Sequence, residues 1–205
     1  MTGDDRQTIV TLDLEGVLVP EIWIAVAERT GIDALRRTTR DEPDYDVLMR
    51  GRLDLLAEHG LGLADIADVI SGITPLPGAR EFLDELRSRV QVLILSDTFE
   101  QFAAPLMRQL GWPAIWCHRV VVDDDGRVAD YLLRIPDQKR RAVDALHGLN
   151  FRVVAAGDSY NDVAMLLAAD KGVLFRSPAN VRAEFPQLPA VDEYDELLVS
   201  LFTAG

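Results

Sequence analysis

The stretch TIVTLDLEGVLV, residues 8–19, places two acidic residues, Asp13 and Glu15, directly after an apolar and β-branched run. Residues 8–14 are typical of a buried strand, because short continuous apolar runs are favoured where helices cover both faces of a sheet. Asp13 and Glu15 then lie on the same side of the chain where that strand ends. Acidic groups at the end of a buried strand are costly unless another group offsets their charge, so this stretch is the first candidate for a functional site.

The rest of the chain predicts the fold around this strand. Further apolar runs typical of buried strands occupy residues 91–95, 152–156 and 172–175. Helix-like segments occupy residues 79–89, 100–110, 138–149, 161–169 and 194–202. The alternation of strand and helix predicts an α/β fold with a doubly wound parallel sheet and right-handed crossovers. Two β-like arms around Asp125 and Gly126 predict a hairpin over residues 120–133.

A segment of different character interrupts this alternation. Between Pro20 and Pro75 the apolar spacing is helical over residues 22–29, 45–59 and 63–71, and no run is typical of a strand. Pro77 and Gly78 mark the return to the α/β pattern. We therefore predict a core domain formed by residues 1–17 and 75–205, with a helical domain, residues 18–74, inserted after the first strand.

Composition excludes several classes of partner. The formal net charge is −13 and there is no long basic block, which argues against binding to nucleic acid or to an anionic membrane. No apolar stretch is long enough for a membrane span, and the acidic start MTGDDRQ is unlike a signal peptide, so we expect a cytoplasmic protein. Cys117 is the only cysteine, so no intrachain disulfide forms, and we expect it to be a small buried residue. The sequence carries no signal for the oligomeric state.

Side chains that could take part in binding or catalysis follow the predicted strands. Asp13 and Glu15 follow the first, Ser96-Asp97-Thr98 follow the second, and Gly157-Asp158-Ser159-Tyr160-Asn161-Asp162 follow a later one. Taken singly, such residues are more often helix caps or turn residues. In a parallel sheet, however, the carboxyl ends of the strands meet at one edge, where ligands bind. So many carboxylates at one edge would repel one another without a counter-charge.

A divalent cation and a lysine would resolve that repulsion. Oxygen ligands are those that Mg²⁺ favours. Lys139, one of only two lysines in a chain that otherwise uses arginine, lies close to the start of a predicted helix. A compact ammonium suits a crowded phosphate site better than a guanidinium group does. We therefore predict a Mg²⁺ and phosphate site in which one carboxylate is free to attack phosphorus.

Four motifs carry a resemblance to a known family. DLEGV at residues 13–17, LSD at residues 95–97, Lys139 and GDSYND at residues 157–162 are similar to the motifs of the haloacid dehalogenase superfamily, in its phosphoserine phosphatase branch. Motif order, approximate spacing and the helical insertion agree over essentially the whole chain. The resemblance implies a Rossmann-like core with a small helical cap. More narrowly, DLEGVLVPEIW, the Asp-Tyr-Asp and arginine of the insertion, and AAGDSYND resemble the bifunctional phosphoserine phosphatase/homoserine phosphotransferase subgroup.

The resemblance implies roles for the residues after the first strand. Asp13 would be the nucleophile that becomes an aspartyl phosphate. Glu15 stands where the family usually has an aspartate that protonates the leaving oxygen and then activates water. The backbone carbonyl of Glu15 would join Asp13 and Asp158 on Mg²⁺, and Asn161 and Asp162 would hold the metal site from its edge.

The resemblance also implies a set of substrate-binding and charge-balancing residues. Lys139 would balance the charge of the nucleophile and the phosphate. Ser96 would donate a hydrogen bond to a phosphoryl oxygen, and Asp97, Thr98 and Asn161 would line the substrate site beside it. The substrate expected from the resemblance is phosphoserine, with homoserine as an alternative acceptor to water.

The helical insertion would recognise the remainder of the substrate. Arg52 matches a family position that binds the substrate carboxylate, and Glu21, aligned across a one-residue gap, lies near the position that binds the ammonium. Without the resemblance, Arg52 could equally be a solvated arginine, and Glu21 could equally be an acidic residue at the start of a helix. The acidic loop at residues 41–46 is expected to be a solvated connection, although it could also screen polyanions from the entrance.

Three other functions remain compatible with the motifs. A receiver-type signalling module also uses aspartate, Mg²⁺, a hydroxyl and lysine, but it lacks a helical insertion. The other two are a phosphatase of another small metabolite, such as a sugar phosphate, and a noncatalytic binding protein. His59, His118 and His147 show no metal-ligand spacing, and Trp23, Trp112 and Trp116 are expected to be packing residues.

Overall fold

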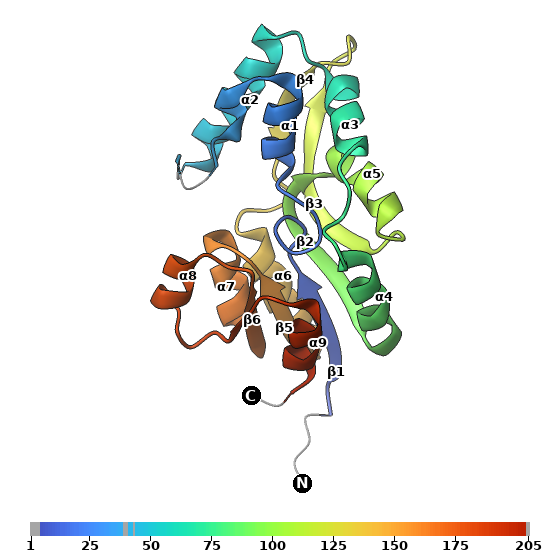
Figure 1. The fold of residues 1–205 in the computed structure, drawn as a ribbon, viewed down its shortest axis with the longest axis vertical. Coiled ribbons are helices and arrows are strands. Elements are labelled where there is room, and N and C mark those ends of the chain that lie inside the picture. The colour runs from blue at the N-terminus through green and yellow to red at the C-terminus, as the bar shows by residue number, and fades with distance from the viewer. Residues whose placement is uncertain (1–4, 39–40, 43, 204–205) are drawn as a thin grey trace.

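A mostly parallel sheet with helices on both faces organises the computed structural model (Figure 1). The structure describes residues 5–38, 41–42 and 44–203. In this part of the chain the strands are β1 (Gln7–Leu12), β2 (Gln91–Phe99), β3 (Ala114–Val122), β4 (Val128–Leu132), β5 (Phe151–Gly157), β6 (Lys171–Phe175) and β7 (Ala190–Val191). Their order is β4-β3-β2-β1-β5-β6-β7, and every neighbouring pair is parallel except the hairpin of β3 and β4. The predicted doubly wound α/β fold is confirmed.

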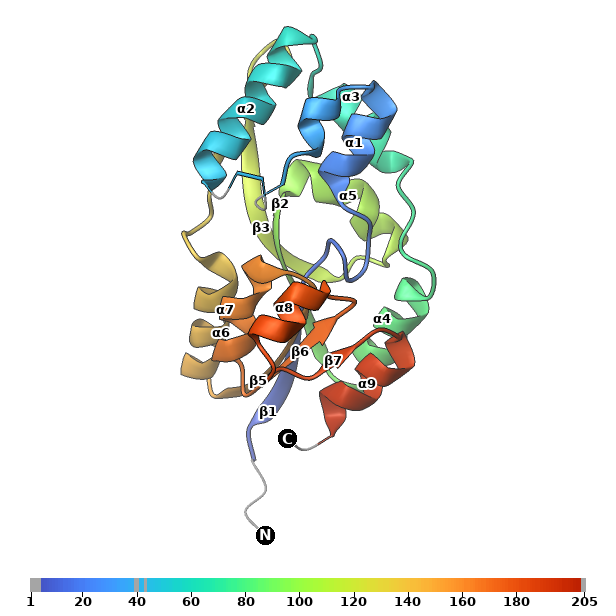
Figure 2. The same ribbon diagram turned by 60° about the vertical axis from the view of Figure 1, so that its left-hand side comes forward.

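The helices cover the two faces of this sheet. Figure 2 shows α6 (Gln138–Gly148) and α7 (Tyr160–Ala168) on one side and α4 (Ala79–Arg89) and α9 (Tyr194–Phe202) on the other. The helix α5 (Glu100–Gln109) packs on β2 and β3, and α8 (Ala179–Glu184) buries Val181 in the cluster beneath α6 and α7. None of the helices in the described residues has both the length and the apolar composition that a membrane span requires.

The core is divided between the two faces because side chains alternate along a strand. In β1, Ile9 packs in the cluster with α6 and α7, whereas Val10 and Leu12 pack in the cluster with α4, α5 and α9. In β2, Leu93 and Ile94 divide in the same way. Burial on both faces explains why these strands read as continuous apolar runs.

The helical segment after β1 contains α1 (Ile22–Thr30), the 3₁₀ helix η1 (Asp33–Arg36), α2 (Tyr45–Glu58) and α3 (Leu63–Ser71). Most of their buried apolar side chains belong to the same hydrophobic cluster as α5 and one face of the sheet. The β3–β4 hairpin reaches α2, because Arg50 pairs with Asp130 at 2.7 Å and the Tyr131 hydroxyl donates to Asp46. The insertion therefore packs on the hairpin as well as on the sheet.

Several expected boundaries differ from the structure. The strand β2 was expected to end at Leu95, but it continues through Ser96, Asp97 and Thr98 to Phe99, with a register irregularity against β3. The strand β3 begins well before the expected hairpin, because its first half pairs with β2 rather than with β4.

The short elements and single residues agree with the predictions only in part. The short elements η1, α8 and β7 were not expected. Trp112 was expected to pack, but it is 62% exposed and has a φ of 57° in the turn after α5. Cys117 is buried as expected. In the acidic loop, Asp44 caps α2 and Asp41 is exposed, while Pro43 lies outside the described residues.

Candidate active site

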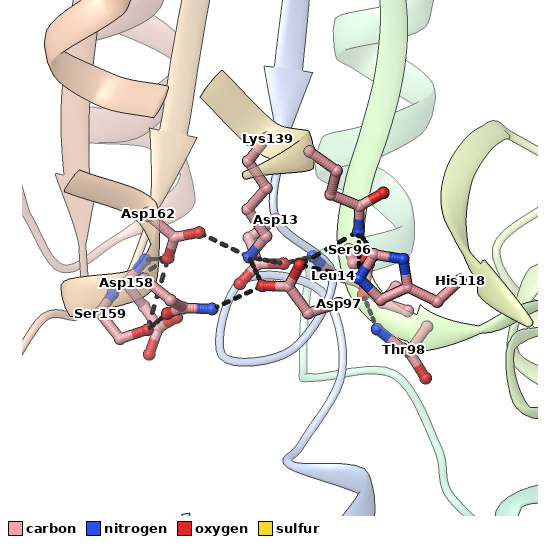
Figure 3. Close-up of polar contacts among 12 residues, drawn as sticks. Asp13, Leu14, Ser96, Asp97, Thr98, His118, Lys139, Asp158, Ser159 and Asp162 are labelled. Atoms are coloured by element: carbon pink, nitrogen blue, oxygen red, sulfur yellow. Dashed lines mark hydrogen bonds and ion pairs between the residues drawn. The ribbon is translucent and has the colours of Figure 1, made fainter. Parts of the chain in front are cut away.

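The carboxyl ends of three neighbouring strands bring the predicted groups together (Figure 3). Asp13 follows β1, and its backbone N–H donates to the Ala156 carbonyl of β5 at 3.0 Å. Asp158 follows β5, Ser96 and Asp97 lie in β2, and Lys139 lies in the first turn of α6. This placement follows from the strand order, in which β1 lies between β2 and β5.

Lys139 is the centre of the ion-pair network. Its side chain is 4% exposed, and Nζ lies 2.8 Å from Asp162 Oδ1, 3.0 Å from Asp13 Oδ1 and 3.4 Å from Asp97 Oδ2. Asp162 accepts a hydrogen bond from Nζ, and Asp13 and Asp97 form ion pairs with it, so three carboxylates surround the one ammonium. Burial alone would lower the pKa of Lys139, but these carboxylates outweigh it and raise that pKa well above its usual value. Lys139 is therefore charged at any physiological pH.

Asp13 is a buried carboxylate with too little positive charge around it. Burial and the neighbouring Asp162 raise its pKa well above the usual value, Lys139 lowers it, and Asp158 and Asp97 raise it further. The Leu14 N–H donates to Oδ1 at 2.7 Å and fixes the side chain. A second positive charge at this point would be needed to keep Asp13 fully ionised.

The residues present fit a divalent metal ion. Asp13, Asp158 and Asp162 each offer a carboxylate oxygen, and these oxygens lie within 4.8 Å of one another. Oxygen-only ligands of high negative charge suit Mg²⁺. Gly16 permits the close approach that this geometry requires, because its φ is 75° and an added Cβ would lie 2.4 Å from the Asp158 Cγ.

Asp162 differs from the other two carboxylates of this group. It is fully buried, and Oδ2 accepts hydrogen bonds from the backbone N–H groups of Asp158 and Ser159 at 2.9 and 3.1 Å. Its other oxygen accepts from Lys139. In this structure Asp162 therefore fixes the loop after β5 and orients the lysine.

Asp97 is held by donors on several elements. Gln138 Nε2 donates to Oδ1 at 3.1 Å, and Asn161 Nδ2 donates to Oδ2 at 3.2 Å. The His118 Nε2 lies 3.6 Å from Oδ1 and 3.3 Å from Gln138 Nε2, and its Nδ1 accepts from the Arg134 N–H.

These contacts determine the charge of Asp97. Burial would raise its pKa, but Lys139 together with the hydrogen bonds from His118, Gln138 and Asn161 holds the pKa well below the usual range. Neither His118 nor Gln138 was predicted to belong to the site. The position of Gln138 beside Lys139 was a usable signal, whereas nothing local marks His118.

A cavity of about 230 Å³ opens above this network, and residues of the helical segment form its other wall. All the predicted site residues except the buried Asp162 line it: Asp13, Glu15, Glu21, Arg52, Ser96, Asp97, Thr98, Lys139, Asp158 and Asn161. Tyr45, which the sequence reasoning did not assign to the site, also lines the cavity, and its hydroxyl donates to the Asp97 carbonyl at 3.2 Å. The Ser96 Oγ accepts from the Thr98 N–H at 3.2 Å, which folds this part of β2 around the cavity.

Glu15 lies between the sheet and the helical segment. Its Oε2 accepts a hydrogen bond from the Ile22 N–H at 2.9 Å, at the start of α1. Burial and the adjacent Glu21 raise the pKa of Glu15 to about 8, against smaller opposing contributions from the Ile22 hydrogen bond and Arg52. The carboxyl group therefore carries a proton at neutral pH.

Arg52 is a buried cation whose guanidinium is only partly satisfied. Its side chain stacks on Trp23 at 4.6 Å, and Nη2 donates to the Arg37 carbonyl at 2.8 Å. Its Nε has no hydrogen-bond partner among the described residues. Burial lowers the pKa of Arg52 to about 10, although Tyr45, Glu15 and Glu21 raise it in part. Arg52 lines the cavity and so places a positive charge beside any anionic group bound there.

Carboxylates beside one ammonium on a doubly wound sheet define a phosphoryl-transfer type of site. A family model described as haloacid dehalogenase-like hydrolase matches residues 8–170, and the chain belongs to this family. Two curated relatives are 61% identical to it. One is the phosphoserine phosphatase of Pseudomonas syringae pv. tomato, aligned over 95% of this chain and 82% of the relative. The other is the phosphoserine phosphatase ThrH of Pseudomonas aeruginosa, aligned over 92% of both.

A solved structure supports the fold independently of close sequence similarity. It is a phosphoserine phosphatase in the apo form, with a TM-score of 0.78 and 19% identity, and the match covers 97% of this chain and 100% of that one. The receiver-type module is disfavoured, because the likeness extends over the helical segment as well as over the sheet.

Proposed function

We propose that this protein is a Mg²⁺-dependent phosphoserine phosphatase that works through an aspartyl phosphate on Asp13. The observation that carries the proposal is the buried Lys139 ammonium, shared by Asp13, Asp162 and Asp97 beside Asp158. The names of the two relatives at 61% identity support phosphoserine as the substrate.

In this proposal Asp13 and Asp158, with the backbone carbonyl of Glu15, hold Mg²⁺, and Asp162 supports them from the edge. When bound, the ion neutralises phosphoryl charge and keeps Asp13 ionised. The Asp13 carboxylate forms a bond to phosphorus while the bond from phosphorus to the serine oxygen breaks. Glu15, protonated at neutral pH, gives its proton to that leaving oxygen.

The second half of the reaction reverses the role of Glu15. As a carboxylate it takes a proton from water, the water oxygen bonds to phosphorus, and the bond from phosphorus to Asp13 breaks. Inorganic phosphate leaves, and both side chains return to their starting states. Lys139 balances the charge of Asp13 and the phosphoryl group throughout, with Ser96, Thr98 and Asn161 around the phosphoryl oxygens.

The remainder of the substrate lies toward the helical segment. We assign the carboxylate of phosphoserine to Arg52, whose buried guanidinium has unused donor capacity. We assign its ammonium to Glu21. In this proposal residues 18–74 form a cap on a core of residues 1–17 and 75–205, and closure of the cap excludes bulk water.

Transfer to homoserine is the second activity that we propose, because the same intermediate can react with an alcohol in place of water. The longer side chain of Glu15, compared with the aspartate usual in the family, favours it by displacing the group that activates water. We further propose that the reaction takes place in the cytoplasm, in serine and threonine biosynthesis.

A product assay with phosphoserine tests both activities. Wild-type protein with Mg²⁺ should release phosphate, and with added homoserine it should form phosphohomoserine. Asp13→Asn should do neither, whereas Asp144→Asn, an exposed substitution on α6 with the same change of charge, should match the wild type. Turnover by Asp13→Asn would overturn the covalent mechanism. A substrate panel in which a sugar phosphate greatly exceeds phosphoserine would overturn the substrate assignment.

A further inference from the structure

Asp97 is a negatively charged side chain in a cavity that, in the proposed function, receives an anion. Its side chain is 33% exposed and lines the same cavity as Asp13 and Ser96. Gln138 and Asn161 donate hydrogen bonds to its two oxygens, and the His118 ring lies beside it. Such a set of donors keeps the carboxylate ionised and in place. A charge that repels the substrate is therefore built into the site.

The geometry of Lys139 indicates what this charge does. Of its three carboxylate partners, Asp162 at 2.8 Å and Asp13 at 3.0 Å are at hydrogen-bond distance, and Asp97 at 3.4 Å is the most distant. Because three carboxylates already surround this buried ammonium, a phosphoryl oxygen that binds Lys139 takes the place of one of them. The partner that is displaced at least cost is the most distant one.

Asp97 and a phosphate oxygen would thus compete for the same position beside the Lys139 ammonium. While phosphate is bound, the Asp97 carboxylate faces the anion without its lysine partner, which disfavours the complex. When phosphate leaves, the ion pair of Asp97 with Lys139 re-forms and stabilises the empty site. The repulsion in the complex and the ion pair in the empty site both weaken the binding of phosphate.

We propose that Asp97 is a positioning residue that competes with inorganic phosphate for Lys139 and thereby promotes release of the product. This role rests on the proposed function. It differs from a direct part in bond making, which remains with Asp13 and Glu15, and it acts through the lysine.

Calorimetric titration with inorganic phosphate in the presence of Mg²⁺ tests the role without turnover. Asp97→Asn should bind phosphate about tenfold more tightly than the wild type, the order expected when one unit charge is removed from a partly solvated contact. Asp97→Glu keeps the charge and should stay within about threefold of the wild type. Asp144→Asn on the exposed side of α6 controls for the change in net charge.

The sign of the change separates this role from simple damage to the site. A disrupted site would bind phosphate more weakly, so weaker or unchanged binding by a folded Asp97→Asn variant overturns the inference. Asp97→Ser, also neutral, should show the same tightening and replaces Asp97→Asn if that variant does not fold. Failure of the wild type to release phosphate from phosphoserine in the presence of Mg²⁺ would instead overturn the proposed function. Product inhibition by phosphate should strengthen in parallel in the neutral variants.

Discussion

Replacing Glu15 with glutamine tests the proposed acid–base group most directly. Glutamine has the same length, and its amide oxygen can accept the hydrogen bond that the Ile22 N–H now donates to Glu15 at 2.9 Å. The stability of the fold should therefore change by less than about 1 kcal/mol. Burial and Glu21 raise the pKa of Glu15 to about 8, so the acid form predominates at pH 7, and the amide cannot supply that proton.

The expected loss follows from the missing proton transfer. Hydrolysis of phosphoserine by Glu15→Gln should fall by about 10²- to 10⁴-fold, the usual contribution of a positioned general acid and base. With p-nitrophenyl phosphate, whose leaving group departs without a proton, the first half of the reaction should persist and the second should stall. Stopped-flow measurements should then show a burst of about one nitrophenolate per enzyme.

The pH profile provides a second readout of the same group. Because the pKa of Glu15 is raised, the acid form persists up to about pH 8, and phosphorylation by phosphoserine in the wild type should fall above that pH. Glu15→Gln should lack this decline. The reasoning is refuted if the variant hydrolyses phosphoserine within about tenfold of the wild type, or if it shows no burst with p-nitrophenyl phosphate.

Four further substitutions test other features of the structure. Glu15→Asp shortens the side chain by one methylene, so hydrolysis should fall by about a hundredfold and the ratio of homoserine transfer to hydrolysis should rise. An unchanged ratio in product analysis would show that the length of the side chain at position 15 does not affect the choice between water and homoserine. Gly16→Ala strains the backbone at a φ of 75° and adds a Cβ that clashes with the Asp158 carboxylate. Mg²⁺ affinity measured by calorimetry should therefore fall at least tenfold. Equal affinity would contradict the proposed metal site. Lys139→Met should abolish turnover and lower the unfolding free energy of the metal-free protein by about 3 to 5 kcal/mol in urea titrations, and a loss under about 1 kcal/mol would argue against the network. Burial raises the pKa of Asp170, but hydrogen bonds from Arg6, a backbone N–H and His147 outweigh it and lower that pKa to about 2. Asp170→Asn should therefore cost up to about 2 kcal/mol above pH 4, and the difference from the wild type should vanish as the pH falls to about 2; a difference independent of pH would contradict the assignment.

The agreement between sequence and structure is best where local pattern and sheet geometry suffice. Asp13 and Asp158 were predicted to meet because each follows an apolar run, and the carboxyl ends of parallel strands lie at one edge. The insertion was predicted to be helical from its spacing alone. The first half of β3 was missed, because its pairing with β2 is a contact between distant parts of the chain.

The sequence by itself thus determined most of the alternation of strands and helices, the helical character of the insertion and the placement of acidic residues after the strands. Only the tertiary structure decided how those groups interact. The Lys139 ammonium forms ion pairs with three carboxylates, and Gln138 and His118 contact the side chain of Asp97. The physical reason is that strand propensity and residue type are local properties. Hydrogen-bond partners and pKa values depend instead on burial and on distances between side chains that are remote along the chain.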